Sequence, residues 1–540
     1  MSGRSRIEAV VGRTLFDDAD DLALAMPASC QRSGRCHECV VEVTDGGDAL
    51  SPPTPAESFL RPPYRLACQA DVVVGDAVIE FRPLRRRLRI LTGDVEPEGP
   101  HPMGADDLDV PVTRTSGAVT YDGEVVDVDR GRLLGLAIDL GTTTVVVEVV
   151  DLETGAMLAV AALENPQSFG GSDVMNRISY DGAHSGELRR ALVRAIDHEL
   201  REICRDLGID RRVIHEAVVV GNATMRDLLF GIDVSSIGQR PYKSVTELDL
   251  LAGTRTSTAL VERAHRIGLW MHPQGRVVSP PLIASHVGAD VAADLVALDA
   301  ASLHGTWMLV DIGTNTEVVV SDGQRILAAS CPAGPAFEGG LVRYGMPGAE
   351  GAIERIRMID GGWAIETIGR VTAEGICGSG LIDLLAELRR HDRMTPKGVF
   401  ADRAGEIVVE PGRGITLSRE DASNLAQAKA ANACGQAILL RRLGIDPGQL
   451  DQVFLAGGFA THIDVANAID IGFLAAVRID RVRKVGNASV RGARRLLLSR
   501  RRRAELDALV ARIDHVELET APDFFELFVD ACQFKPMEAA

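Results

Sequence analysis

The chain has 540 residues, enough for three or four domains of about 150 residues each. Hydrophobic residues make up 46% and charged residues 25%, a balance typical of soluble globular proteins, and no apolar run approaches the ~18 residues of a membrane span. The net charge of −18, from 58 basic and 76 acidic residues, disfavours nucleic acid as the main partner. The N-terminus lacks the apolar core of a signal peptide, so we expect a cytoplasmic protein that binds no membrane.

Four of the nine cysteines, Cys30, Cys36, Cys39 and Cys68, lie in the first 70 residues. In a cytoplasmic chain, this crowding indicates metal binding rather than disulfides. Zinc sites usually pair two C-x2-C knuckles or add histidines at fixed spacing. Three thiolates on one loop and a fourth from a distant strand instead suit a 2Fe-2S cluster. The spacing therefore favours 2Fe-2S, with zinc and unligated thiols as the alternatives.

Strands are predicted on both sides of this cysteine loop, because residues 39–43 and 71–74 contain runs of β-branched residues. His37 lies between two predicted ligands. A Rieske centre would need two histidines, so we expect His37 to be a solvent-facing loop residue.

Residues 84–133 are rich in Pro, Gly and Asp and show no sustained helical or strand period. They predict a semi-rigid linker that lets an electron carrier swing, with a candidate hairpin at residues 117–128. Two arginine clusters, at residues 85–89 and 500–503, are expected to be solvated faces.

Two later stretches, residues 137–147 and 309–319, read almost alike. Each has an apolar run, an Asp, a Gly, small polar residues and a second β-branched run, which predicts a strand, a tight turn and a strand. The turn hydroxyls and amides can face a phosphate, and Asp139 and Asp311 lie where they could hold Mg²⁺ through water. Two copies predict two similar lobes that close on one nucleotide. The residues predicted to line the phosphates are Gly141, Thr142, Thr143, Thr144, Gly313, Thr314 and Asn315.

The first lobe is predicted to alternate strands and helices, with a helix at residues 187–207 and a buried strand before a helix at residues 218–225. Asp290 precedes another helix. Two readings of Asp290 stay open: it caps that helix, or its carboxylate reaches the γ-phosphate or the attacking water.

In the second lobe, Glu338 lies in a Gly/Pro loop after the second turn and competes with Asp290 as the catalytic carboxylate. Gly378 opens a predicted helix whose glycines allow an anion to approach its N-terminus. A long helix at residues 427–443 carries Lys429, which we expect to be exposed. The strand that ends at Gly457, Gly458 and Phe459 is predicted to pass close to the adenosine.

The two turns and the late Gly-Gly strand together resemble the acetate and sugar kinase, heat-shock chaperone and actin superfamily. The blocks at residues 64–69 (YRLACQ), 220–225 (VGNATM), 334–340 (GPAFEGG) and 485–489 (VGNAS) resemble those of the reductive activators of corrinoid proteins, over nearly the whole chain.

The resemblance implies a β-grasp 2Fe-2S ferredoxin domain at residues 1–83, a linker at 84–133, and a two-lobed, ribonuclease H-like α/β ATPase of actin type, with lobes at 134–305 and 306–540. It implies that Cys30, Cys36, Cys39 and Cys68 hold the cluster, that Asp139 and Asp311 hold Mg²⁺, and that Gly457 and Gly458 flank the adenosine of ATP.

The activity implied by the resemblance is ATP-dependent, one-electron reduction of inactive Co(II) to Co(I) in the corrinoid protein of a methyltransferase system. An upstream electron donor would reload the cluster, and the family implies a homodimer. Two other functions remain: an ATP-dependent electron donor to a different low-potential enzyme, and a redox-gated, chaperone-like ATPase.

Overall fold

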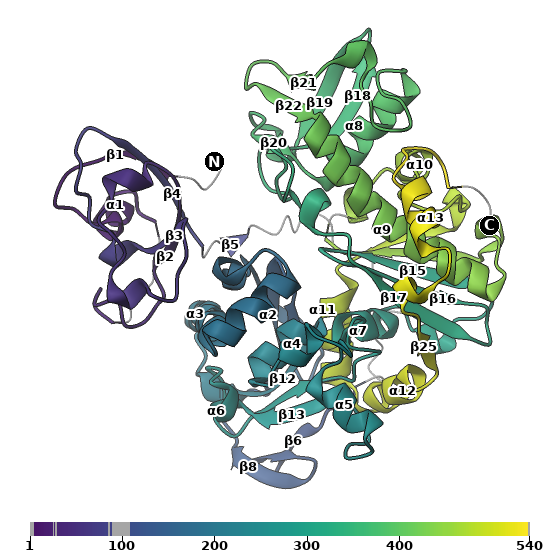
Figure 1. Cartoon of the computed structure of the whole chain (residues 1–540). Helices are drawn as coiled ribbons and strands as arrows, with labels where there is room; N and C mark the ends of the chain where they lie inside the picture. The colour runs from purple at the N-terminus through teal and green to yellow at the C-terminus, as the bar shows by residue number, and fades with distance from the viewer. Residues whose placement is uncertain are drawn as a thin grey trace.

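The computed structural model of the protein describes residues 5–24, 26, 30–84, 87–88, 108–458 and 460–537 (Figure 1). Phe459, predicted to contact the adenosine, and the side chains of the arginine cluster at residues 85–89 lie outside the described residues. Within these ranges, no helix is both long and apolar enough to cross a bilayer.

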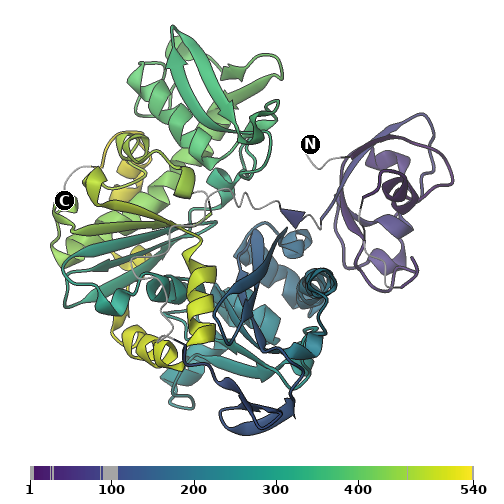
Figure 2. The same cartoon turned by 180° about the vertical axis from the view of Figure 1, so that it is seen from behind.

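The N-terminal domain is a small sheet with helix α1 (Leu15–Asp21), and it stands beside the first lobe (Figures 1 and 2). Its described strands pair in the order β1-β4-β2-β3. The prediction of a strand at residues 71–74 is wrong. The backbone amides of Val73 and Val74 both donate to the Ala49 carbonyl and do not form the hydrogen-bond ladder of a strand. The strands are β1 (Ser5–Glu8), β2 (Val40–Asp45), β3 (Tyr64–Leu66) and β4 (Val78–Pro83).

The described part of the linker region contributes strands to two sheets. β5 (Arg87–Leu88) pairs with the edge of the first-lobe sheet. The hairpin predicted at residues 117–128 is confirmed as β7 (Ala118–Tyr121) and β8 (Glu124–Val128), and β6 (Val112–Thr115) adds a third strand.

The first lobe is built on a mixed sheet whose described strands run in the order β13-β14-β12-β9-β10-β11-β5. β9 and β10 form the predicted antiparallel pair around the first turn, and β12 runs parallel to β9. The strands are β9 (Leu134–Leu140), β10 (Thr144–Asp151), β11 (Met157–Glu164), β12 (Ile214–Gly221), β13 (Leu260–Arg263) and β14 (Arg276–Ser279). The helices are α2 (Val174–Ala183), α3 (Glu187–Leu207), α4 (Ala223–Phe230), α5 (Val245–Leu251), α6 (Ala264–Ile267) and α7 (Ala289–Ala297), with the 3-10 helix η5 (Pro166–Gly170) before α2.

The second lobe repeats this arrangement. Its central sheet has the described order β24-β23-β15-β16-β17-β25, with β15 and β16 antiparallel around the second turn and β23 parallel to β15. The twin strand-turn-strand units predicted from the sequence are therefore confirmed. The strands are β15 (Trp307–Ile312), β16 (Thr316–Ser321), β17 (Ile326–Cys331), β23 (Gln452–Ala456), β24 (Val482–Gly486) and β25 (Ile513–His515).

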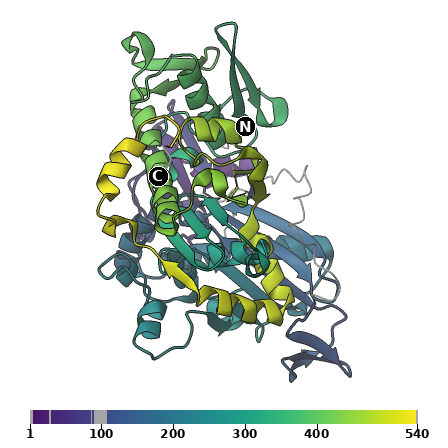
Figure 3. The ribbon, with the colours of Figure 1, turned by 90° about the vertical axis from the view of Figure 1, so that its right-hand side faces the viewer.

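An insertion between β17 and β23 forms the upper part of the second lobe in Figure 1, and the long helix α9 connects it to the central sheet. α13 lies along α9, yellow against green in Figure 3. The insertion contains β18 (Ala352–Ile359), β19 (Gly362–Thr367), β20 (Gly375–Ile376), α8 (Gly378–Arg390), β21 (Glu406–Glu410) and β22 (Ile415–Ser418). The remaining helices are α9 (Arg419–Leu443), α10 (Val465–Asp470), α11 (Ala488–Leu498), α12 (Arg500–Val510) and α13 (Phe524–Ala531).

The chain crosses back to the first lobe near its C-terminal end. α11 packs against α7 and against β9 and β12. A Cβ on Gly492 of α11 would lie 1.9 Å from the Ala293 carbonyl oxygen of α7, so only glycine permits this close crossing. Two further helices, α12 and α13, follow α11 in the chain.

One prediction of an exposed cation is wrong, and a second is right for only part of its cluster. Lys429 is 1% exposed and its Nζ donates to the Gln533 carbonyl 2.7 Å away, so the C-terminal segment covers it. In the cluster at residues 500–503, Arg502 pairs with Asp299, and Arg503 makes a bidentate pair with buried Glu216 at 2.9 Å. Arg502 and Arg503 therefore connect elements, whereas the side chains of Arg500 and Arg501 are 50% and 58% exposed, as predicted.

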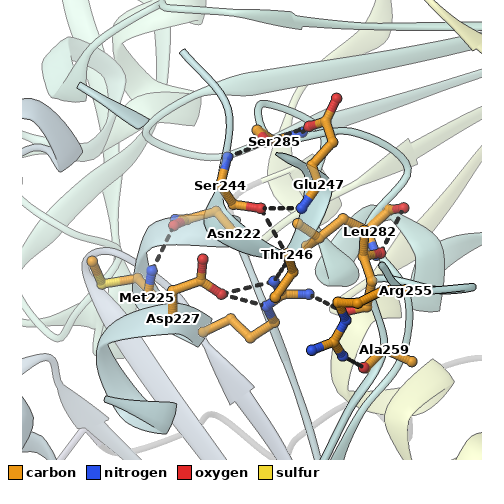
Figure 4. A network of polar contacts seen from close by, with 12 residues as sticks. Asn222, Met225, Asp227, Ser244, Thr246, Glu247, Arg255, Ala259, Leu282 and Ser285 are labelled. Atoms are coloured by element: carbon orange, nitrogen blue, oxygen red, sulfur yellow. Dashed lines mark hydrogen bonds and ion pairs between the residues drawn. The ribbon is translucent and has the colours of Figure 1, made fainter. Parts of the chain in front are cut away.

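A buried ion pair stabilises the first lobe. The Arg226 guanidinium lies 2.7 Å from the Asp227 carboxylate, and both side chains are fully buried. Arg226 also donates to Thr246 Oγ1 and to the Thr258 carbonyl, within the polar network of Figure 4. The carboxylate therefore neutralises a cation that has no access to water.

Replacing Asp227 with Asn should lower the free energy of unfolding by about 3–5 kcal/mol, because the Arg226 charge is then buried without compensation. Urea unfolding followed by circular dichroism measures the loss. Asp206→Asn is the control, since Asp206 is 61% exposed on α3 and such surface changes cost roughly 0.5 kcal/mol or less. Equal losses in the two variants would contradict the role given to this pair.

Candidate functional site

The two turns predicted to bind phosphate, residues 141–144 and 313–316, are named the phosphate turns after that prediction, and they face each other across the interface between the lobes. Thr143 Oγ1 of the first turn lies 3.1 Å from Thr314 Oγ1 of the second. Glu338 connects them, because one of its carboxylate oxygens accepts from Thr143 Oγ1 at 3.0 Å and from Thr314 Oγ1. Burial raises the pKa of Glu338, while the two threonine hydroxyls act in the opposite direction. The structure thus brings together one predicted carboxylate and one hydroxyl from each turn.

Steric contact explains the glycine of the first turn. A Cβ on Gly141 would lie 2.5 Å from the Thr144 carbonyl oxygen, so the first turn needs glycine. In the second turn the Gly313 amide donates to the Asn315 carbonyl at 3.0 Å.

Three side chains that sequence reasoning missed hold the first turn in place. Asn165 Nδ2 donates to the Gly141 carbonyl at 2.8 Å, and Asn222 Nδ2 donates to Thr142 Oγ1 at 3.0 Å. Arg177, 1% exposed, donates through Nη2 to the Thr142 carbonyl at 2.7 Å. These bonds fix the turn from behind and leave its Thr143 hydroxyl directed at the other lobe.

The two asparagines also cap helices. Asn222 ends β12 and caps α4 by accepting from the Met225 amide, while Asn165 caps η5 by accepting from the Gln167 amide. Each amide side chain thus uses its oxygen on its own helix and its nitrogen on the phosphate turn. Asn222 directly follows a predicted buried strand, and that position is the signal by which it could have been found.

Five carboxylates gather beside the turns, namely Asp139, Asp290, Asp294, Asp311 and Glu317. Burial and the neighbouring Asp290 raise the pKa of Asp139 to about 7, and burial raises the pKa of Asp311 to about 6. The pKa values of Asp294 and Glu317 are raised well above their usual range, first by burial and then by neighbouring carboxylates. No lysine or arginine of the described residues pairs with these five groups, so burial and mutual repulsion favour their protonated forms.

Asp290 does not cap its helix. Gly288 is the N-cap of α7 and Asp290 lies in the first turn, where burial and Asp311 raise its pKa to about 7. The capping alternative is therefore wrong. Asp294, one helical turn later on the same face of α7, was missed, although its spacing of four residues from Asp290 is the available signal.

The start of α11 contacts two of these carboxylates. Asn487 Nδ2 donates to Asp139 at 3.0 Å, and Ser489 Oγ donates to Asp294 at 3.0 Å. Residues that follow a second-lobe strand therefore hold carboxylates of the first lobe. Within the described part of the chain, no three His, Cys, Asp or Glu side chains are arranged to hold a metal ion directly.

The other glycines predicted to contact the nucleotide have different surroundings. Gly457 has φ +101°, and a Cβ there would lie 2.1 Å from the Ile312 carbonyl oxygen, so it is needed where β23 ends beside β15. Gly458 faces open space. Gly378 is buried at the start of α8, and the close approach in that block is of Gly380 to the backbone of Ile353, which gives the glycines a packing role. The anion-binding role of Gly378 stays a prediction.

The four N-terminal cysteines are free thiols that form two contacting pairs. Cys30 hydrogen-bonds with Cys36, and Cys39 with Cys68. Burial opposes ionisation of Cys30, but hydrogen bonds from Ser33 and Cys36 lower its pKa to about 6; the bond with Cys39 lowers the pKa of Cys68 to about 7. Two irons with two thiolates each need four such groups in two pairs, so the donor set fits a 2Fe-2S cluster.

His37, expected to face solvent, contacts the first lobe instead. Its Nδ1 lies 3.0 Å from Glu187 Oε2 of α3, and its ring stacks on Phe59. The prediction failed because the ferredoxin domain packs against the lobe, which the sequence alone did not indicate.

Comparison with known proteins finds matches over most of the chain. Residues 2–73 match the model described as the 2Fe-2S iron-sulfur cluster binding domain, residues 134–302 the RACo middle region, and residues 305–540 the C-terminal domain of RACo, the ASKHA domain. The chain is similar to a solved structure, the reductive activator for corrinoid, iron-sulfur protein, with 27% identity, a TM-score of 0.71, and coverage of 98% of this chain and 97% of that one.

Two curated relatives agree. The corrinoid activation enzyme RamQ of Eubacterium limosum is 30% identical over 424 residues, which cover 74% of this chain and 70% of RamQ. The [Co(II) methylated amine-specific corrinoid protein] reductase of Methanosarcina barkeri is 23% identical over 430 residues, covering 74% of this chain and 76% of that protein. With its 2Fe-2S domain, middle region and actin-like ASKHA domain in this order, the chain belongs to the RACo family of reductive activators of corrinoid proteins.

Proposed function

We propose that this protein uses ATP to drive the one-electron reduction of a corrinoid protein from inactive Co(II) to Co(I), with the electron supplied by its 2Fe-2S cluster. The observation that carries the proposal is one chain with two functional centres. It combines two pairs of cysteine thiols in a ferredoxin domain with two phosphate turns that meet at the Glu338 carboxylate. The relatives named for corrinoid activation and for Co(II) corrinoid reduction support the choice of substrate.

The cluster would be held by Cys30 and Cys36 on one iron and by Cys39 and Cys68 on the other, following the two contacting pairs. When bound, it would supply one electron; clusters of plant-type ferredoxins have potentials near −400 mV. The protein's own part is to exclude water, because Cys36 is 4% and Cys39 1% exposed.

ATP would lie between the lobes, with its terminal phosphates at the Thr142–Thr143 and Thr314–Asn315 turns and its adenosine beside Gly457 and Gly458. The buried carboxylates explain why a cation is needed. Asp139 and Asp311 are buried in the strands that lead into the two turns and have raised pKa values, so Mg²⁺ held by them through water would offset their negative charges.

The role of ATP is to supply driving force. Corrinoid Co(II) is harder to reduce than a ferredoxin cluster, and a gap of about 100–200 mV corresponds to roughly 2–5 kcal/mol for one electron. Closure of two lobes on a nucleotide can supply this energy by changing how the activator binds its partner. A grip on the Co(II) form that removes an axial ligand would raise the cobalt potential.

Between the two candidate catalytic carboxylates, we favour Glu338 as the group that positions the attacking water. It contacts the hydroxyls of both turns, so it lies where the γ-phosphate would meet water. Asp290 instead lies within the carboxylate group on α7, beside Asp311. Asp290 would then act on the metal and its water shell.

Cys68→Ser should abolish the visible absorbance and the electron paramagnetic resonance signal of the reduced cluster, because one iron loses a thiolate. Cys204→Ser is the matched control, since Cys204 is a buried thiol on α3 far from the loop in sequence. A Cys68→Ser protein with an intact cluster, or a wild type that binds zinc and is colourless, would contradict the ligand assignment.

Asp311→Asn should eliminate ATP-dependent formation of Co(I), followed by its absorbance, and leave the cluster spectrum unchanged. The physical reason is loss of the charge that holds Mg²⁺ beside the second turn. Asp360→Asn is the control, because Asp360 is an exposed turn residue with φ +50°, a conformation that Asn tolerates. Activity of Asp311→Asn equal to that of the control would show that the site is misplaced.

Glu338→Gln should reduce ATP hydrolysis by a factor of about 10²–10⁴, the usual contribution of a positioned acid or base. Phosphate release measures the rate, and Glu350→Gln, an exposed carboxylate of the same connection between β17 and β18, serves as control. If Asp290→Asn stops hydrolysis while Glu338→Gln does not, the two carboxylates have exchanged roles.

A further inference from the structure

The ferredoxin domain is docked on the first lobe through the loop that carries the cysteines. His37 pairs with Glu187 of α3 at 3.0 Å, and Glu38 lies 3.7 Å from Arg194 of the same helix. His37 and Glu38 lie between the ligands Cys36 and Cys39 in the sequence. In the docked position, α3 therefore covers the edge of the domain from which an electron would leave.

An aromatic contact extends the docking surface into the lobe. The Phe59 ring stacks on His37 at 4.0 Å and meets Phe169 of η5 edge-on at 5.9 Å. Phe169 in turn packs edge-on against Tyr180 of α2, whose hydroxyl donates to the Phe59 carbonyl. The three rings Phe59, Phe169 and Tyr180 are each 5% exposed or less, so the hydrophobic core runs continuously from the ferredoxin domain into the first lobe.

The residues next to these aromatic side chains hold the first phosphate turn. Asn165 lies four residues before Phe169. Its side-chain Nδ2 donates to the Gly141 carbonyl at 2.8 Å, and its backbone N–H donates to the Thr143 carbonyl at 2.7 Å. Arg177, three residues before Tyr180 on α2, donates to the Thr142 carbonyl at 2.7 Å. Residues 165–183, which comprise η5 and α2 and which we name the η5–α2 segment, thus contact the ferredoxin domain at one side and the phosphate turn at the other.

The segment is locked into one piece. Arg177 of α2 also donates to the Gly171 carbonyl at 3.0 Å and to Gln167 Oε1 of η5 at 3.4 Å. A Cβ on Gly170 would lie 2.6 Å from a Leu188 methyl of α3, and one on Gly171 would lie 2.3 Å from the Asn176 Cβ. The chain has no free space at Gly170 and Gly171, where η5 meets α2. A displacement at one end of the segment must therefore move the other end.

We propose that the η5–α2 segment couples nucleotide binding at the first phosphate turn to docking of the ferredoxin domain, so that each favours the other. This inference rests on the proposed binding of ATP at that turn. Docking fixes Phe169 and Tyr180, and through them Asn165 and Arg177, so the carbonyls of the turn are positioned before the phosphates arrive. Because the ordering cost is then already met, nucleotide binds the docked form more tightly.

Reciprocity gives the functional consequence. If docking strengthens nucleotide binding by some factor, nucleotide strengthens docking by the same factor. The ferredoxin domain is retained on α3 while ATP fills the turn and is released when the turn empties. The nucleotide thereby sets when the cluster is free to reach the cobalt.

The test weakens docking from the lobe side, where no cluster ligand is touched. In the full-length, cluster-loaded protein, Tyr180→Phe removes the hydroxyl bond to Phe59, and Glu187→Gln removes the charge that faces His37. Calorimetric titration with a non-hydrolysable ATP analogue should show a Kd raised about fivefold in the double variant, near the lower end of coupling between two sites. Glu202→Gln, which breaks a surface pair with Arg205 on the same helix α3, should leave the Kd unchanged.

A second readout separates coupling from a general loss of structure. Small-angle X-ray scattering should show that the analogue shifts wild type toward the compact, docked form, and that the double variant needs more analogue for the same shift. Glu187→Gln alone, which keeps the buried Tyr180 contact, should give an intermediate Kd and guards against misfolding of the double variant. Equal Kd values for wild type, Glu187→Gln and the double variant, with the cluster absorbance intact, would overturn the inference. A wild type that binds no analogue would instead overturn the proposed nucleotide site.

Discussion

The interaction on which the rest of the structure depends is the bridge of Thr143, Glu338 and Thr314 between the lobes. Each turn is short and comes from a separate sheet, so neither alone encloses a ligand. Each lobe supports its turn with a similar sheet core, in which two antiparallel strands flank the turn and a parallel strand follows. The bridge converts two similar half-sites into one site, and the first-lobe side of that site is held rigidly by Asn165, Asn222 and Arg177.

Charge is distributed unequally around this bridge. Asp294, Glu317 and their neighbours on one side have raised pKa values because each is buried beside other carboxylates. On the other side, Arg177 is buried among neutral acceptors, and burial lowers its pKa to about 10. Buried charges of either sign cost several kcal/mol when they lack a partner. The phosphates of a bound nucleotide would pair with Arg177, and a divalent cation bound to them would pair with the carboxylates.

Much of the fold could be predicted from the sequence because local patterns determine it. The two strand-turn-strand units, the helix at residues 187–207 and the strand that ends at Gly221 follow from apolar runs and turn residues. The four cysteines follow from their spacing. What could not be predicted is the burial of polar side chains by distant segments. Lys429 is covered by the C-terminal segment, Arg503 meets Glu216 some 290 positions away, and His37 meets α3. Asp294 and Arg177 resemble ordinary surface residues in sequence, and only their tertiary neighbours reveal them.

The crossing of α7 and α11 at Gly492 has a consequence for the proposed closure of the two lobes. No side chain separates the two backbones there, so the helices touch at a point and can rotate about it with little sliding. Asn487 and Ser489 lie within about one and a half turns of this point and donate to Asp139 and Asp294 of the first lobe. In the proposed closure of the lobes, the acidic side of the site would therefore lie at the hinge and change little. The edges of both lobes far from this crossing, where a partner protein would bind, would move farthest.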